Sequence, residues 1–250
     1  MWEPTESDLA NYARDGFIVV RRLLSEGEVH DYQNAIDIAI GTIMPRGELT
    51  DPFQRVFIQM HQVWQTEPAL RSLSLSDGIA RAASQLMGTR PVRLFLDQVI
   101  YKQPGALPTA AHQDAPFLSF DDVRSVNCWI AFDKTTEQNG ALEYYRGSHA
   151  LGRLRLVELD RSASLADEVE ELQSFPLEKA FAEPGDAVFH NCLVVHQAFG
   201  NSTNRPRRAF SIQYMPLEAH FNGWMHPFMQ TFEPRIGDVL ALPCFPILAA

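Results

Sequence analysis

The spacing of apolar residues differs between the two parts of the chain that meet near residue 90. Before that point, apolar positions recur with the period of an amphipathic helix. Three helices are predicted there, over Leu9–Asp15, Ser25–Ile40 and Ser76–Met87. Ser25 and Glu28 have the spacing of a capping box, which favours a helix start at this position. The short apolar run Phe17–Val20 predicts a strand, so residues 1–90 are expected to be mainly helical.

From Pro91 onward the chain consists of short apolar runs separated by turn residues such as Pro104-Gly105 and Asn139-Gly140. Strands are predicted over Val92–Lys102, Ser125–Phe132, Ala141–Tyr145, Ala187–His190, Leu193–Ala198 and Arg208–Tyr214. Many short strands between turns are typical of a β-sandwich or jelly roll. A charged stretch, Ser164–Leu172, is predicted to form a helical insertion between strands.

The expected fold class is therefore mainly β with flanking helices, in a single domain that spans residues 1–250. Residues 1–90 would supply helical support, and residues 91–216 would form the jelly-roll core. The tail, residues 217–250, is a candidate cap over a site in that core.

Composition narrows the classes of partner. The hydrophobic fraction is 46% and the charged fraction 21%, as in ordinary soluble proteins, and no apolar run is long enough for a membrane span. The N-terminus lacks a basic-then-apolar leader, so a cytoplasmic location is expected. A formal net charge of -10 argues against nucleic acid and anionic membranes as partners, and leaves a small molecule. The three cysteines, Cys128, Cys192 and Cys244, form no CxxC pair and are expected to be small buried side chains.

The segment His112-Gln113-Asp114 is the strongest candidate for chemistry, because it combines with a later histidine. Side chains two apart in an extended segment point to the same side, so this imidazole and carboxylate can converge. His196 follows in an apolar run that predicts a buried strand. Two imidazoles and one carboxylate on one face of a metal leave the other positions open, as in non-haem Fe(II) oxygenases. His190 is an alternative third ligand, but the spacing to Arg207 favours His196.

A cluster of arginines around residue 207 is the candidate anion site. A guanidinium that points inward needs an anion, and the carboxylate of a co-substrate such as 2-oxoglutarate supplies one. Alternation along a strand places Arg207 and Arg208 on opposite faces. It does not choose between them, because Arg208 shares its face with large apolar residues that could themselves be core.

The motifs and their order resemble those of the phytanoyl-CoA dioxygenase family of Fe(II)/2-oxoglutarate oxygenases. The likeness covers nearly the whole chain. The segments that carry it are Arg14–Val20, Leu23–Glu26, Tyr101–Gly105, His112–Asp114, Trp129–Asp133, Glu137–Leu142, Gly147–His149, Gly185-Asp186 and His196–Ala209.

This resemblance implies a double-stranded β-helix, the cupin-like form of the jelly roll. It implies His112, Asp114 and His196 as ligands of Fe(II), with 2-oxoglutarate and O₂ as co-substrates. It also implies Arg207 as the salt-bridge partner of the distal 2-oxoglutarate carboxylate, which resolves the choice between the arginines. Lys102 and Trp129 match positions that line the 2-oxoglutarate site in relatives.

Two positions depart from the family pattern. Gln197-Ala198 stands where relatives commonly have Gly-Ser after the distal histidine, so another group must replace that serine hydroxyl. Arg146 stands in place of a common proline before Gly-Ser-His, as a loop substitution or a substrate contact.

The implied reaction is oxidation of a C–H bond of a small molecule, most simply hydroxylation, with release of succinate and CO₂. Desaturation, cyclisation or epimerisation by the same oxidant is the alternative, as is a cupin-like lyase or isomerase that uses no 2-oxoglutarate. A non-catalytic binding protein is disfavoured because every ligand is retained. Aromatic residues near the metal motif and in the tail are core or pocket walls: Phe95, Phe117, Phe120, Trp224, Met225 and Phe228. Without a clear basic cluster for its phosphates, a coenzyme A ester is less favoured than a free specialised metabolite or a modified small acid.

Overall fold

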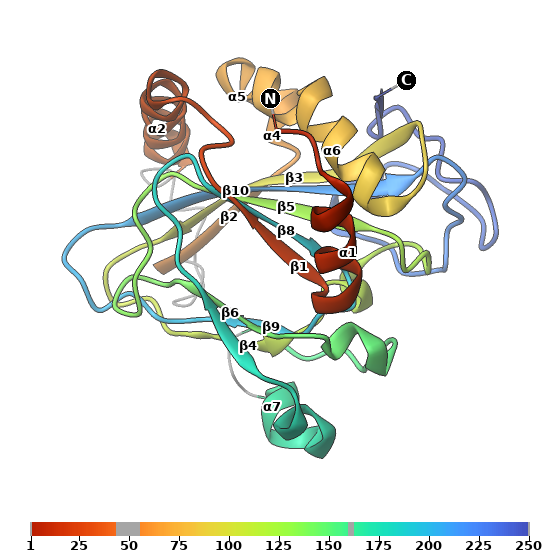
Figure 1. Ribbon diagram of the computed structural model, residues 1–250. Helices are drawn as coiled ribbons and strands as arrows, with labels where there is room; N and C mark the ends of the chain where they lie inside the picture. The colour runs from red at the N-terminus through yellow and green to blue at the C-terminus, as the bar shows by residue number, and fades with distance from the viewer. Residues whose placement is uncertain (1, 44–55, 160–162, 250) are drawn as a thin grey trace.

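Two antiparallel β-sheets face each other, and a layer of helices covers the outer face of the larger sheet (Figure 1). The computed structural model describes residues 2–43, 56–159 and 163–249. Both ends of the described chain lie on the helical side of the molecule, and α7 lies at the opposite end, beyond the smaller sheet (Figure 1). The arrangement is a jelly roll, as the sequence predicts.

The larger sheet has seven strands within the described residues, in the order β1-β8-β5-β10-β3-β11, with β2 also paired to β3. Their bounds are β1 Phe17–Val20, β2 Phe57–His61, β3 Val92–Lys102, β5 Val126–Ala131, β8 Ala187–Asn191, β10 Arg207–Pro216 and β11 Ile247–Leu248. Strand β10 is central and pairs along its length with β3 and β5. Successive side chains of β10 point to opposite faces of the sheet, so every second one enters the space between the two sheets.

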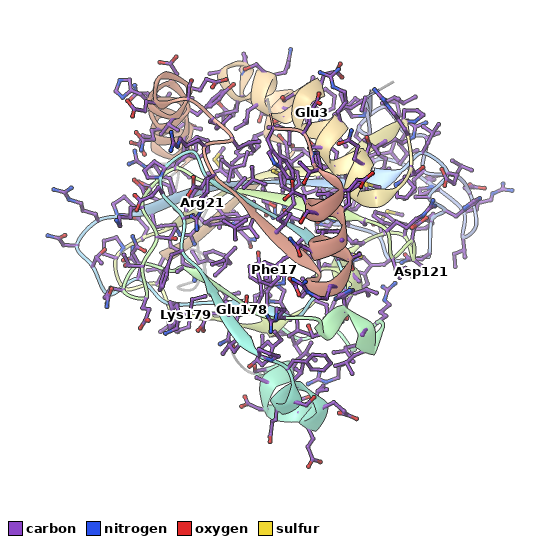
Figure 2. The ribbon with its side chains drawn as sticks, viewed as in Figure 1. Glu3, Phe17, Arg21, Asp121, Glu178 and Lys179 are labelled. Atoms are coloured by element: carbon purple, nitrogen blue, oxygen red, sulfur yellow. The ribbon has the colours of Figure 1, made fainter. Side chains whose placement is uncertain are left out.

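The smaller sheet, within the described residues, has four strands in the order β4-β9-β6-β7. Their bounds are β4 Thr109–His112, β6 Leu142–Tyr145, β7 Leu177–Ala180 and β9 His196–Ala198. Phe17 of β1 stacks on Tyr144 of β6 with ring centroids 4.3 Å apart, so side chains bridge the two sheets on the side that Figure 2 presents. Small buried residues such as Ala131 and Ala209 complete this packing.

The helices follow the sequence signals closely. They are α1 Glu6–Asp15, α2 Glu26–Ile43, α4 Val63–Thr66, α5 Pro68–Ser74, α6 Asp77–Met87 and α7 Leu165–Glu168. Helix α1 begins earlier than predicted because Thr5 and Asp8 form a reciprocal capping box, and it ends at the left-handed Gly16. The predicted insertion over Ser164–Leu172 is α7 followed by a 3₁₀ turn, Glu170–Ser174.

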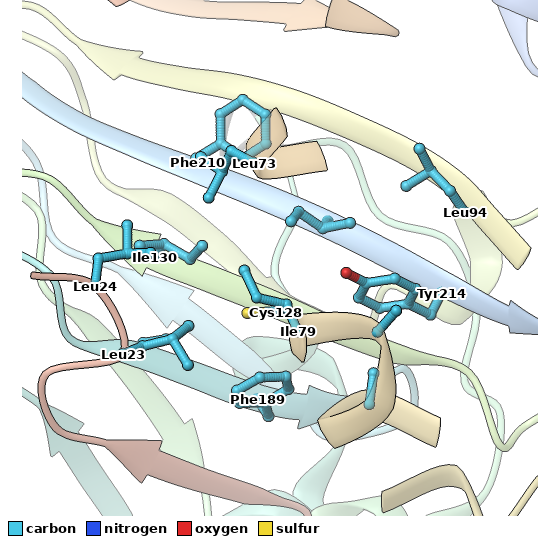
Figure 3. Close-up of a cluster of buried hydrophobic side chains, with 14 of the residues drawn as sticks. Leu23, Leu24, Leu73, Ile79, Leu94, Cys128, Ile130, Phe189, Phe210 and Tyr214 are labelled. Atoms are coloured by element: carbon cyan, nitrogen blue, oxygen red, sulfur yellow. The ribbon is translucent and has the colours of Figure 1, made fainter. Parts of the chain in front are cut away.

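The main core lies between the larger sheet and the helices (Figure 3). From β10, Phe210, Ile212 and Tyr214 point into it, and Leu73 of α5 and Ile79 of α6 pack in the same cluster. Burying an aromatic or branched side chain stabilises the fold by roughly 1.5–3 kcal/mol. This apolar packing fixes β10, and therefore fixes the alternate residues that face the cavity between the sheets.

One strand prediction differs from the structure in a way that matters for the site. The run Leu193–Ala198 was expected to be a single strand, but only His196–Ala198 pairs as β9. The residues before it form a turn, in which the backbone N–H of Leu193 donates to the side-chain oxygen of Asn191 at 2.8 Å. Val194 and Val195 are nevertheless buried, because Val194 packs between the two sheets and Val195 packs in the cluster that contains Leu165 of α7. The apolar run Leu193–Ala198 therefore predicted burial correctly, but it predicted a strand that is longer than the observed one.

Several other features bear on the sequence expectations. The elements β2, α4, α5, β4 and β7 were not predicted, since they are short and lack a long periodic pattern. The three cysteines are buried and unpaired, as expected. Among the helices of the described residues, none combines the length and apolarity that a transmembrane span requires.

Candidate active site

A cavity of about 300 Å³ lies between the two sheets, and the residues predicted to bind the metal and the co-substrate line it. Histidines from the smaller sheet face side chains from β3, β5 and β10 of the larger one. The sequence predictions His112, Asp114, His196, Arg207, Lys102 and Trp129 are therefore brought together in one place.

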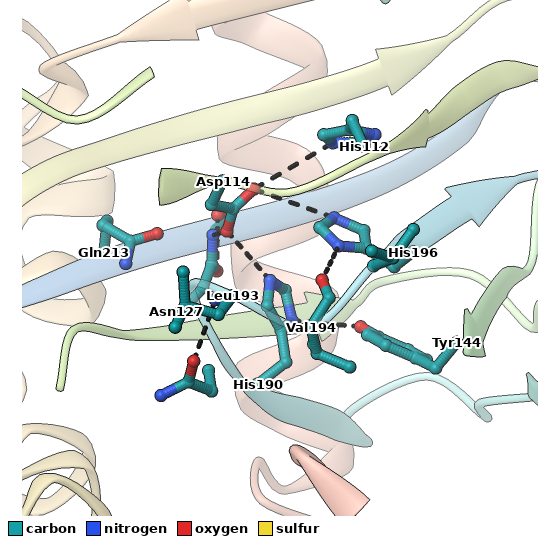
Figure 4. Close-up of polar contacts among 12 residues, drawn as sticks. His112, Asp114, Asn127, Tyr144, His190, Leu193, Val194, His196 and Gln213 are labelled. Atoms are coloured by element: carbon teal, nitrogen blue, oxygen red, sulfur yellow. Dashed lines mark hydrogen bonds and ion pairs between the residues drawn. The ribbon is translucent and has the colours of Figure 1, made fainter. Parts of the chain in front are cut away.

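His112, Asp114 and His196 form the centre of this cavity (Figure 4). Each offers one ligand atom, and these atoms all lie within 4.8 Å of one another. Nε2 of His112 is 4.0 Å and Nε2 of His196 is 3.7 Å from Oδ1 of Asp114. His112 pairs with His196 across β4 and β9, so the two imidazoles are held side by side by the backbone.

The convergence of His112 and Asp114 has a different origin from the one predicted. Strand β4 ends at His112, and Asp114 has helical backbone angles at the start of a 3₁₀ turn, Ala115–Phe117. Gln113 fixes this turn, because its amide donates to the carbonyls of Gly152 and Leu193. The carboxylate thus turns back toward the imidazole through a corner, and simple strand alternation does not describe it.

The two imidazoles have defined tautomers. Nδ1 of His112 lies 2.7 Å from the carbonyl of Ala110, and Nδ1 of His196 lies 3.1 Å from the carbonyl of Val194. A carbonyl oxygen only accepts, so each Nδ1 carries the proton and each Nε2 presents a lone pair to the centre. This is the orientation that a histidine needs to bind a metal through Nε2.

The second oxygen of Asp114 is held by two side chains. His190 donates through Nε2 at 3.0 Å, and the Asn127 amide donates at 3.1 Å, both to Oδ2 (Figure 4). Nδ1 of His190 is in turn 3.0 Å from the hydroxyl of Tyr144. His190, the alternative ligand considered from the sequence, therefore contacts the carboxylate. Oδ1 is left facing the two Nε2 atoms.

The protonation states also suit a metal. Burial acts to raise the pKa of the Asp114 carboxyl, but the hydrogen bond from His190 and the electrostatic interaction with the neighbouring imidazoles outweigh it and hold the pKa below its usual range. Burial lowers the pKa of both His112 and His196. At neutral pH the centre therefore contains one carboxylate and two neutral imidazoles, the forms that bind a divalent cation.

Replacing His190 by leucine is expected to lower Fe(II) affinity by about 10- to 100-fold, because Asp114 loses a group that orients it. Tyr144→Phe, which removes only the hydroxyl beyond His190, should have a smaller effect. The matched control is His30→Leu, an exposed histidine on α2. Anaerobic competition against a chelator measures the affinity, and equal affinities in the His190 and His30 variants would contradict the positioning role.

Arg207 is a buried cation that faces the same cavity. Its side chain is 1% exposed, and its Nε and Nη1 have no hydrogen-bond partner among the described residues. The guanidinium carbon lies 5.4 Å from the ring centroid of Trp129. Burial lowers the pKa of Arg207 to about 10, so the group is still a cation at neutral pH. A buried cation with unpaired N–H groups is costly, which makes this a place for an anionic ligand.

Arg208 is on the other face of β10 and is already paired. It makes ion pairs with Asp133 at 2.6 Å and with Asp37 at 2.9 Å. Of the two arginines that alternation left open, only Arg207 enters the cavity, together with Ser211 and Gln213 of the same strand face. Lys102 is the cross-strand partner of Arg207, and its ammonium donates to the carbonyl of Phe199 at 2.7 Å.

Gly140 lies directly behind these two cations. A Cβ there would be 3.0 Å from the Lys102 side chain, 3.2 Å from the carbonyl of Phe199 and 3.4 Å from Arg207, and the residue has a φ of +101°. Gly105 has a similar φ, +85°, but its added Cβ would meet nothing within 4 Å. A comparison of substitutions at Gly140 and Gly105 therefore separates the effect of backbone strain from the effect of crowding at the two cations.

Both Gly140→Ala and Gly105→Ala should destabilise the fold by about 1–2 kcal/mol, because an L-residue is strained in this conformation. Only Gly140→Ala is expected to raise the 2-oxoglutarate concentration needed for half-maximal turnover, because its Cβ crowds the Lys102 side chain beside Arg207. Thermal unfolding and 2-oxoglutarate titrations measure the two effects. An unchanged requirement in Gly140→Ala would show that the cations do not bind the co-substrate.

The two positions that depart from the family pattern lie in different places. Arg146 pairs with Glu178 at 2.8 Å and is not part of the cavity wall, which supports the loop-substitution interpretation. Gln197 and Ala198 line the cavity, as do the hydroxyl-bearing Thr109 and Ser211. His61 and His226 have no ligand motif around them in the sequence, yet both line the cavity. Contacts between distant segments put them there, and no local pattern reveals such contacts.

The aromatic candidates divide between wall, core and surface. Phe95 and Phe117 line the cavity, and Phe120 packs behind Phe95 in the core. From the tail, Phe228 packs on Phe95, whereas Trp224 and Met225 are exposed.

A jelly roll with two imidazoles and one carboxylate at its centre, beside a buried arginine, defines the class of Fe(II)- and 2-oxoglutarate-dependent oxygenases. The profile of the phytanoyl-CoA dioxygenase (PhyH) family matches residues 12–209. The chain therefore belongs to that family, and it is an oxidoreductase that uses Fe(II), 2-oxoglutarate and O₂.

Relatives show how varied the reactions within this fold are. The chain is 27% identical over 219 residues to the methylphosphonate hydroxylase of Gimesia maris, with 85% of this chain and 81% of that one covered. The non-heme alpha ketoglutarate dependent carbocyclase SnoK from nogalamycin biosynthesis superposes with a TM-score of 0.83 at 28% identity, covering 98% and 96% of the two chains. The epimerase SnoN from the same biosynthesis gives 0.78 at 25% identity, with 96% of each chain covered.

Proposed function

We propose that this enzyme oxidises a C–H bond of a small molecule, with hydroxylation as its reaction, and that His112, Asp114 and His196 hold the Fe(II). The proposal rests on one observation, which is that the three candidate metal ligands and Arg207 line the same cavity. The ligand atoms of these three residues lie within 4.8 Å of one another, in a cavity that Arg207 also lines. A metal held there keeps positions free for 2-oxoglutarate and O₂.

The donor set and the buried cation both fit the cofactor that the family uses. The distal carboxylate of 2-oxoglutarate would satisfy the unpaired Nε and Nη1 of Arg207. Lys102 would add positive charge beside it, and Trp129 would hold the guanidinium in place. Bound Fe(II), with 2-oxoglutarate and O₂, supplies an oxidant strong enough for an unactivated C–H bond.

The chain's own residues set the geometry. His190 and Asn127 hold the Asp114 carboxylate so that one oxygen faces the metal position. Backbone carbonyls hold both imidazole rings in the ligating tautomer. The apolar walls at Phe95, Phe117 and Leu118 keep water away from the substrate position.

The alternative is a reaction other than hydroxylation, and the resemblance to SnoK and SnoN supports it. A carbocyclase and an epimerase have this fold, so the fold is compatible with reactions other than hydroxylation. The same site would then perform cyclisation, epimerisation or desaturation. A lyase or isomerase without 2-oxoglutarate has no support, since the chain belongs to an oxygenase family.

The test is the formation of succinate from 2-oxoglutarate in air. It should depend on added Fe(II) and stop when a chelator is present. Labelled O₂ then distinguishes the reactions, because hydroxylation places an oxygen atom in the product and cyclisation or epimerisation does not. No succinate under any metal supplied would contradict the proposal.

A further inference from the structure

The end of the cavity formed by β2, β3 and the C-terminal segment contains polar side chains that the chemistry above does not use. They are Gln59, His61, Gln98 and His226. Strand β2 supplies two of them by alternation, since Gln59 and His61 face the cavity while Ile58 packs in the main core. The tail supplies His226, so residues far apart in the sequence form one wall.

His61 is already partnered within this wall. It lies opposite Gln98 in the pairing of β2 with β3, and the Gln98 side chain hydrogen-bonds to it. The Gln59 amide donates to the Gln98 oxygen at 3.2 Å. These three side chains therefore hold one another in place and present a neutral polar surface.

His226 is different, because its hydrogen-bonding capacity is unused. Its ring lies 4.0 Å from Phe228 and 5.4 Å from His61, centroid to centroid. Burial lowers the pKa of His226 to about 3, so the ring is neutral at neutral pH. Nδ1 is buried without a partner, and no hydrogen bond to Nε2 occurs among the described residues.

The neutral tautomer of His226 follows from this burial. A neutral imidazole has one N–H and one lone pair. An orphaned buried N–H is rarer in proteins than an under-satisfied acceptor, so the proton belongs on Nε2, the nitrogen that is not sealed in. His226 therefore offers a donor that no protein group uses, on a ring that lines the cavity.

The surface around this donor is aromatic. Phe95 is fully buried and lines the cavity, with Phe228 at 5.6 Å and the His226 ring at 6.2 Å from it, centroid to centroid. Such faces suit a ring-bearing apolar skeleton. Among the described residues of the cavity wall, the charged groups are Lys102, Asp114 and Arg207, and the metal and 2-oxoglutarate account for these. The substrate end is thus neutral.

We propose that this His61–His226 wall recognises the substrate: a neutral, ring-bearing, largely apolar molecule whose carbonyl or hydroxyl oxygen accepts a hydrogen bond from His226. The assignment rests on the proposed function, because it places the substrate beside the same metal centre. Such a neutral substrate differs from the anionic one that the name of one relative, methylphosphonate hydroxylase, indicates.

A matched pair of probes tests the assignment. 1-Tetralone and tetralin share a two-ring skeleton, and only the ketone accepts a hydrogen bond. Equilibrium dialysis against protein loaded anaerobically with Fe(II) and 2-oxoglutarate measures both affinities. The wild-type protein should bind the ketone roughly tenfold more tightly, the effect of one well-made hydrogen bond.

His226→Phe keeps an aromatic ring against Phe228 and removes the donor, so the preference should fall below about twofold while tetralin affinity is kept. His226→Gln restores a donor and should recover part of the preference. His220→Phe, at an exposed position, is the control and should behave as wild type.

Equal binding of ketone and hydrocarbon by the wild type, binding of neither, or a preference that survives in His226→Phe would each overturn the inference. Failure of the proposed function would have a different signature. The visible absorption of 2-oxoglutarate chelated to Fe(II) would then be missing from the wild-type protein, whatever the dialysis shows.

Discussion

Asp114→Ala is expected to reduce succinate release by more than about two orders of magnitude and to abolish tight Fe(II) binding. The substitution removes the only carboxylate of the candidate centre, and the loss of groups that merely orient a ligand already costs 10- to 100-fold. It also leaves the donors of His190 and Asn127 unsatisfied, so some loss of stability accompanies the loss of activity. Rates of succinate formation and anaerobic Fe(II) titration measure the effect.

His112→Ala should give the same loss of turnover, because the centre would then have one imidazole. The matched control is Asp121→Ala, which removes a carboxylate that pairs with Arg153 at the surface. Thermal unfolding separates misfolded variants from inactive ones. Wild-type turnover in either folded ligand variant would remove the assignment of this site.

Arg207→Met is expected to raise the 2-oxoglutarate requirement by about tenfold to a hundredfold. A charge-assisted hydrogen bond contributes roughly 1.5–3 kcal/mol, and each 1.4 kcal/mol is a factor of ten in affinity. The same variant should be no less stable than the wild type without co-substrate. The reason is that it removes a buried cation whose Nε and Nη1 have no partner among the described residues.

Arg208→Met should show the opposite pattern. It breaks the ion pairs with Asp133 and Asp37, so the melting temperature should fall, while the 2-oxoglutarate requirement is unchanged. The two neighbouring arginines thus separate co-substrate binding from fold stability. A 2-oxoglutarate requirement that rises equally in both variants would refute the specific role of Arg207.

The sequence predicted the residues of the centre better than their geometry. The alternation argument for His112 and Asp114 reached the right convergence, but the structure produces it with a turn that Gln113 stabilises. Alternation along β10 could not choose between Arg207 and Arg208. The apolar residues next to Arg208 face the helices, and that becomes evident only once the helical layer is placed.

Contacts between segments that lie far apart in the chain could not be predicted from the sequence. His190 was weighed as a ligand, and its contact with Asp114 depends on how β8 lies beside β5. His61 and His226 meet because the tail returns over β2, and neither has a motif around it. The division into 1–90, 91–216 and 217–250 stays a prediction, although the tail does supply His226 to the cavity wall.

The central claim is that one Fe(II) ion binds between the two sheets with 2-oxoglutarate directed at Arg207. The most direct measurement is a crystal structure of the protein grown and soaked anaerobically with Fe(II) and 2-oxoglutarate. We expect the ion on Nε2 of His112, Nε2 of His196 and Oδ1 of Asp114, with the distal carboxylate of 2-oxoglutarate on Arg207. An ion bound elsewhere, or 2-oxoglutarate that leaves Arg207 without an anion, would contradict the account.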